Sequence, residues 1–133
     1  TQYVPMIRAA SALNEGSREN AIQALATTAP YELGENRTGM SLGPIYLRGE
    51  AYLAAKQGAS AAAEFQKVLD HPGIVTNSPI GALAHLGLGR AYALSGDKAK
   101  AASAYQDFLA LWKDADPDIP ILKEAKAEYA KLQ

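Results

Sequence analysis

Apolar and small residues recur at helical spacing along this chain, and short polar breaks separate the runs. In the best-defined stretch, Leu88 and Tyr92 fall on one helical stripe, and Ala101 and Tyr105 fall on a second. Gly96 lies between the two stripes, where a glycine readily adopts the left-handed conformation that ends a helix. The pattern predicts two helices that pack against each other as a hairpin.

The same spacing predicts seven helices in the whole chain. They cover about residues 3–14, 17–29, 42–57, 59–70, 79–95, 97–114 and 119–132. A long connection at about 30–43 is interpreted as a spacer, with a functional role as the alternative, because loops of this length sometimes have a function. Composition agrees, because 27 Ala and 15 Leu stand against only 3 Val and 7 Ile. Ala and Leu favour helices, whereas strands favour β-branched residues, so the sequence predicts an all-α fold.

Residues forty positions apart match each other in size and character. The matching pairs are Gly49 with Gly89, Tyr52 with Tyr92, Ala61 with Ala101, Phe65 with Tyr105, and Leu69 with Leu109. A weaker first copy gives three units, at about 3–41, 42–81 and 82–116. We expect each unit to be a helical hairpin whose small residues allow a close crossing. The amphipathic helix at about 119–132 would then cap the last unit.

The unit resembles the tetratricopeptide repeat, whose signature is W-x2-L-G-x2-Y followed by A-x3-F. The third unit carries the resemblance through His85, Leu88, Gly89, Tyr92, Ala101 and Tyr105, with His85 in place of the usual Trp. The sequence departs from the family in placing Arg8 and Arg48 where Leu is usual, and in its longer period. The resemblance implies one domain over residues 1–133, folded as a right-handed α-α superhelix with a C-terminal capping helix.

Several stretches resemble, more narrowly, the C-terminal repeat region of bacterial serine/threonine protein kinase-like proteins. These stretches are residues 30–34, 46–53, 63–67, 70–75, 79–84 and 105–132. In such proteins a kinase or a winged-helix DNA-binding domain precedes the repeats. The resemblance implies a docking or sensing module for protein–protein interaction within a larger protein. The alternative is the effector or sensor domain of a bacterial transcriptional regulator.

Charge and composition exclude several classes of protein. The chain has 13 Lys and Arg against 14 Asp and Glu, a net charge of −1, so it lacks the basic surface of a nucleic-acid-binding protein. It has no cysteine and no apolar run long enough to span a membrane. We expect no nucleic-acid partner and no membrane insertion, while cytoplasmic and extracytoplasmic locations both stay open. Because the chain begins with Thr1, we interpret it as a fragment of a longer protein.

Three local patterns resemble sites of chemistry, and each is better explained by packing or capping. They are Gly87 with Gly89, Asp114 with Asp116 and Asp118, and His71 with His85. A nucleotide-binding glycine loop must follow a strand, and no strand precedes these glycines. The aspartates lack the Gly and Glu of a calcium loop, and the histidines lack a third ligand. We expect no catalytic, cofactor-binding or metal-binding residue, and therefore no enzyme.

What remains is a binding surface. In tetratricopeptide arrays the first helix of each unit lines a concave groove that holds a peptide or protein segment. Carried over to this sequence, the resemblance implies the groove residues Tyr3, Met6, Asn14, Tyr46, Glu50, Leu53, Leu86, Arg90 and Leu94. Glu50 and Arg90 occupy equivalent sites, where they would either pair across neighbouring units or contact a ligand.

Two further expectations concern partners. The implied groove contains few basic or amide side chains, which are the groups that bind a carboxylate. We therefore expect weak or no binding to acidic C-terminal tails. The first unit also has no unit before it in this sequence. We therefore expect weak homodimer formation through this open N-terminal edge.

Overall fold

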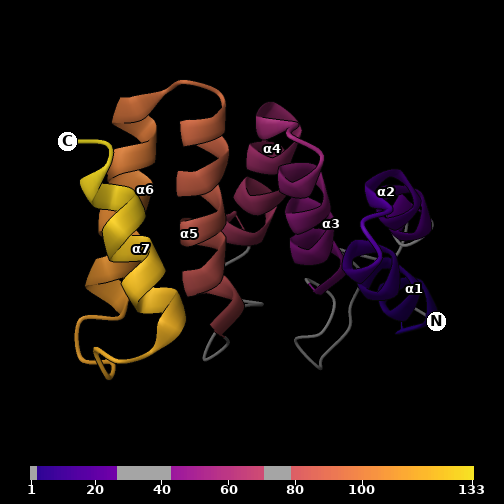
Figure 1. Ribbon diagram of the computed structural model, residues 1–133, viewed down its shortest axis with the longest axis horizontal. Helices are drawn as coiled ribbons and strands as arrows, with labels where there is room; N and C mark the ends of the chain where they lie inside the picture. The colour runs from indigo at the N-terminus through magenta and orange to yellow at the C-terminus, as the bar shows by residue number, and fades with distance from the viewer. Residues whose placement is uncertain (1–2, 27–42, 71–78) are drawn as a thin grey trace.

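The computed structural model describes residues 3–26, 43–70 and 79–133, and these residues form seven α-helices and no strand (Figure 1). The helices are α1 (Tyr3–Asn14), α2 (Arg18–Ala26), α3 (Gly43–Ala54), α4 (Gly58–Leu69), α5 (Pro79–Leu94), α6 (Lys98–Leu111) and α7 (Pro120–Ala130). The prediction of an all-α fold is confirmed. The largest differences at described helix ends are in α3 and α6, each of which stops three residues before the expected end. The predicted connection at 30–43 falls almost entirely outside the described residues.

Successive helices pack as hairpins that are stacked in chain order. The hairpins are α1–α2, α3–α4 and α5–α6, and each lies against the next through α2 with α3 and α4 with α5. The first helices of neighbouring hairpins also touch, α1 with α3 and α3 with α5. Figure 1 shows the three hairpins in a row, with α7 placed beside α6 at the C-terminal end.

Each hairpin turns at a residue with positive φ, and these residues are forty positions apart. They are Gly16 (78°), Lys56 (63°) and Gly96 (84°). At the third turn, Gly96 N–H donates to the Ala93 carbonyl at 3.2 Å, and Asp97 N–H donates to the Tyr92 carbonyl at 2.9 Å. The other two turns have the same pair of hydrogen bonds. This arrangement is the Schellman motif, which satisfies carbonyl groups at the end of a helix.

Lys56 has a side chain at a backbone conformation that favours glycine. We expect Lys56→Gly to raise the free energy of unfolding by roughly 0.5–1 kcal/mol, because relief of left-handed strain exceeds the added entropy of the unfolded chain. Gly96→Ala should lower it by about 1 kcal/mol. A Cβ at Gly96 would meet nothing within 4 Å, so this variant reports on the backbone alone. Urea unfolding of the three proteins measures both effects, and identical midpoints would contradict the prediction.

Small residues occupy the helix crossings, as the repeat predicts. Ala21, Ala61 and Ala101, which are forty positions apart, are all fully buried. At the same register Gly89 faces Tyr105, and a Cβ built on this glycine would lie 3.0 Å from the ring. The absence of a side chain in the first helix therefore makes room for an aromatic ring from the second.

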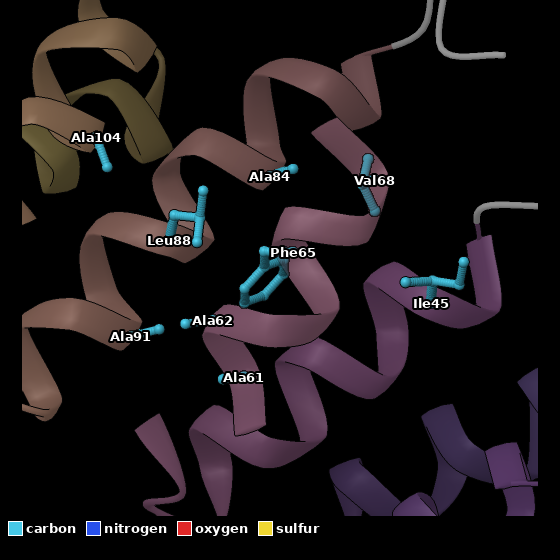
Figure 2. Close-up of a cluster of buried hydrophobic side chains, with 9 residues drawn as sticks. All are labelled: Ile45, Ala61, Ala62, Phe65, Val68, Ala84, Leu88, Ala91 and Ala104. Atoms are coloured by element: carbon cyan, nitrogen blue, oxygen red, sulfur yellow. The ribbon is translucent and has the colours of Figure 1, made fainter. Parts of the chain in front are cut away.

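Phe65 of α4 joins the second and third hairpins. Its ring is fully buried among apolar residues of α4 and α5 (Figure 2). A Cβ on Gly49 of α3 would lie 2.7 Å from the ring, and a Cβ on Gly87 of α5 would lie 2.5 Å from it. The ring therefore fits between two helices that lack side chains at the points of contact. Gly87 thus serves helix packing, as its position within a helix predicts.

Candidate functional site

Four of the predicted groove residues lie on α1 or at the end of α5, and the structure describes the side chains of two of them. Tyr3 and Met6 belong to α1, and their side chains lie outside the described part. Asn14, at the end of α1, is exposed. Leu94, at the end of α5, is 41% exposed.

Leu86 does not belong to an open surface. It is 1% exposed and packs in a cluster with Leu122 and Ala125 of α7. The expectation that this residue lines a groove is therefore wrong. The physical reason is that α7 supplies the apolar cover which Leu86 requires, so a ligand cannot contact it.

Three of the four remaining predicted residues belong to a group of polar side chains carried by α3, α5, α6 and α7. We call this group the polar cluster. Its members are Tyr46, Glu50, Arg90, Tyr105, Glu124 and Glu128. Tyr46, Glu50 and Arg90 are expected from the sequence. The other three residues join the cluster because α6 and α7 pack beside α5. Leu53, the other predicted residue on α3, is partly buried against the core.

Arg90 is the centre of the hydrogen bonds in the polar cluster. Its Nε and Nη2 donate to the two carboxylate oxygens of Glu128, each at 3.0 Å, and Nη2 lies 3.4 Å from Glu124 Oε2. The Tyr105 hydroxyl donates to Glu128 at 2.7 Å. Arg90 thus holds α7 by a two-point pair with Glu128, whereas the sequence leaves open whether Arg90 pairs with Glu50 or contacts a ligand. Such two-point pairs fix orientation as well as adding energy.

The two carboxylates on either side of Arg90 have opposite electrostatic environments. Burial acts to raise the pKa of Glu128, but hydrogen bonds from Arg90 and Tyr105 outweigh it, and the pKa lies below its usual value. Burial raises the pKa of Glu50 above its ordinary value of 4.5, and the charge of Arg90 and a hydrogen bond from Tyr46 oppose this only in part. Glu50 is therefore the poorly compensated charge of the cluster.

The raised pKa of Glu50 has a defined effect on stability. The folded state binds the Glu50 proton more tightly than the unfolded state does. Stability therefore falls as the pH rises from the ordinary pKa through the folded-state pKa, and Glu50 destabilises the folded protein at neutral pH. A partly buried group that is kept at a cost to stability is a candidate for function.

Tyr46 fixes one end of the polar cluster to the core. Its ring packs edge-on against Phe65, with ring centroids 5.6 Å apart, and its hydroxyl donates to Glu50. Burial, followed by the charge of Glu50, raises the pKa of the Tyr46 hydroxyl far above its ordinary range, so it stays protonated and able to donate. The Glu50 carboxylate is thus held in place by a rigid neighbour.

The charges of the polar cluster do not balance. Three carboxylates, those of Glu50, Glu124 and Glu128, lie around the guanidinium of Arg90, and the charge of Lys131 also acts on Glu128. The negative charges still exceed the positive ones. The cluster therefore suits a cationic group, such as a Lys or Arg side chain of a partner. Within the described ranges, no group of three His, Cys, Asp or Glu side chains is placed to hold a metal ion.

A second charged group, which the predicted groove residues do not include, lies inside the stack. Arg48 is 5% exposed, and its Nη1 donates to the Leu25 carbonyl of α2 at 3.0 Å. Its Nη2 lies 3.2 Å from the buried Glu64 carboxylate of α4. Arg48 therefore ties the second hairpin to the first. Comparison of the three units does indicate that position 64 is unusual, because the equivalent positions are both alanine, Ala24 and Ala104.

No model of a known protein family matches the sequence, and no curated protein matches it. In the part of the chain that the structure describes, no helix has both the length and the apolar character needed to cross a membrane.

Proposed function

We propose that the chain is a helical-repeat interaction domain of the tetratricopeptide type that binds a segment of a partner protein without catalysing a reaction. The proposal includes a right-handed superhelix of three hairpins closed by α7. It is supported by turns of one kind every forty residues and by the recurring contact between a glycine and an aromatic ring. Sequence resemblance supports placing the domain in a larger bacterial protein, of the serine/threonine kinase-like class.

The polar cluster carries the proposal. It runs across α3, α5 and α7, on the side where resemblance to tetratricopeptide repeats implies ligand contact. Its excess negative charge favours a partner segment that contributes a Lys or Arg side chain, with neighbouring apolar residues packed on the helices. Glu50 is the group that would gain most from such a partner, because a cation would compensate its buried charge.

The test uses Glu50→Gln in the whole chain. The probes are short synthetic peptides with one central Lys among apolar residues, and matched peptides with Glu in place of Lys. We expect the Lys peptides to bind and the Glu peptides not to bind. Glu50→Gln should weaken binding at least roughly tenfold, since a charge-assisted hydrogen bond contributes about 1.5–3 kcal/mol. The same variant should raise Tm near pH 7, and this gain should vanish below about pH 4, where Glu50 is protonated in both states.

The matched control is Glu19→Gln, which removes an exposed carboxylate from α2. It should leave binding unchanged. Equal binding of the Lys and Glu peptides, or full binding by Glu50→Gln, would contradict the proposed site. Separate measurement of Tm distinguishes a loss of binding from a loss of fold.

A further inference from the structure

The face of α1 that points away from the stack has residues suited to packing against another helix. Because hairpins repeat every forty residues, positions 7, 8 and 11 of α1 correspond to 47, 48 and 51 of α3 and to 87, 88 and 91 of α5. In α3 and α5 this face packs on the preceding hairpin, through contacts such as Arg48 with the Leu25 carbonyl and Gly87 with Phe65. Among the described residues, no hairpin packs on the equivalent face of α1.

Burial at the equivalent positions shows the difference. Ala51 and Ala91 are fully buried, and Leu88 and Arg48 are 4% and 5% exposed. On α1, by contrast, Ile7 is 69% exposed, and Arg8 and Ser11 are also exposed. An isoleucine this open is uncommon in a register where its counterparts meet another helix. The small Ser11 stands where the two fully buried alanines allow close approach.

Arg8 restricts what can cover this face. Its counterpart Arg48 is neutralised by Glu64 of its own hairpin, but the position equivalent to Glu64 in α2 is Ala24. An occupant that buries Arg8 must therefore supply a negative charge of its own.

Glu15 of a second copy supplies that charge. The Ser11 hydroxyl donates to Glu15 Oε1 at 3.2 Å, which places the Glu15 carboxylate on the same face of α1. Arg8 precedes Ser11 by one helical turn and Glu15 follows it by one turn. Two α1 helices that cross antiparallel at Ser11 therefore bring each Arg8 to the other Glu15. The face is self-complementary in charge, as a two-fold interface requires.

We propose that the chain forms a two-fold homodimer in which the α1 helices cross antiparallel at Ser11, with reciprocal Arg8–Glu15 pairs beside Ile7. This inference does not depend on the proposed function. Sedimentation equilibrium of the whole chain from about 1 µM to about 1 mM measures it. The expected result is a monomer–dimer equilibrium that weakens with added salt.

Charge reversal tests the geometry. Arg8→Glu alone places two carboxylates together in each reciprocal pair, and Glu15→Arg alone places two guanidinium groups together. Each variant should therefore dimerise at least roughly tenfold more weakly than the original chain. In an equimolar mixture of the two variants, every pair has opposite charges. The mixture should therefore form a heterodimer at concentrations at which each variant alone is monomeric.

Two further variants complete the test. Ile7→Glu should abolish the dimer, whereas Leu111→Glu, which changes a leucine that is 60% exposed on α6, should leave it unchanged. All these positions are exposed, and circular dichroism checks that each variant keeps its helices. A chain that stays monomeric at about 1 mM would overturn the proposal and leave the face to another helix. Failure of the mixed variants to associate would equally overturn the crossing at Ser11.

Discussion

Phe65→Ala is expected to lower the free energy of unfolding by about 3–5 kcal/mol, a large part of the stability of a domain of this size. The ring is fully buried and contacts Gly49 and Gly87, which have no side chains to fill the space that the ring would leave. The cavity should therefore stay open, which places the expected loss in the upper part of the range. Guanidinium unfolding followed by circular dichroism measures it.

The glycines provide a matched test of the same contact. An alanine in an exposed helix interior is normally more favourable than glycine by about 1 kcal/mol. At position 49 we expect the opposite sign, because the added methyl group would lie 2.7 Å from the Phe65 ring. In Gly49→Ala combined with Phe65→Leu, the smaller side chain should recover part of the loss. A stabilising Gly49→Ala, or a loss below about 1 kcal/mol for Phe65→Ala, would contradict the proposed packing.

Glu64→Ala should cost about 3 kcal/mol or more, because it leaves the buried charge of Arg48 without its carboxylate. The double variant Arg48→Met with Glu64→Leu removes both charges and keeps most of the volume. Its stability should return to within about 1 kcal/mol of the original chain, or exceed it. Urea unfolding of the single and double variants yields the coupling energy between the two positions.

Lys67 provides the control for this pair. It also contacts Glu64, at 3.1 Å, but its side chain is 48% exposed. Lys67→Met should therefore change the free energy of unfolding by less than about 1 kcal/mol. A loss as large as that of Glu64→Ala would show that the effect comes from surface charge rather than from the buried pair.

The helices could be predicted from the sequence because their pattern is local. Apolar spacing and the stops at residues such as Gly16 and Gly96 locate most of the described helix ends within a residue or two. The turn at Lys56 follows the repeat register although its residue type does not favour the conformation. Here the stacking of neighbouring hairpins outweighs local propensity.

The candidate site could be predicted only in part. Tyr46, Glu50 and Arg90 follow from the repeat, because each lies on a first helix of a hairpin. The cover over Leu86 and the pairing of Arg90 with Glu128 depend on where α7 packs, and the repeat contains no earlier copy of α7 to indicate this. The terminal helix is therefore the element whose tertiary position changes the site most.

The stacking in chain order also bears on how the protein is made. The main contacts join helices of one hairpin or of adjacent hairpins, so most of them connect parts of the chain that are close in sequence. Such sequence-local topologies close their contacts at low entropic cost and fold rapidly. As the nascent polypeptide leaves the ribosome, each hairpin can pack on the one synthesised before it, and Phe65 would meet Gly87 only when α5 emerges.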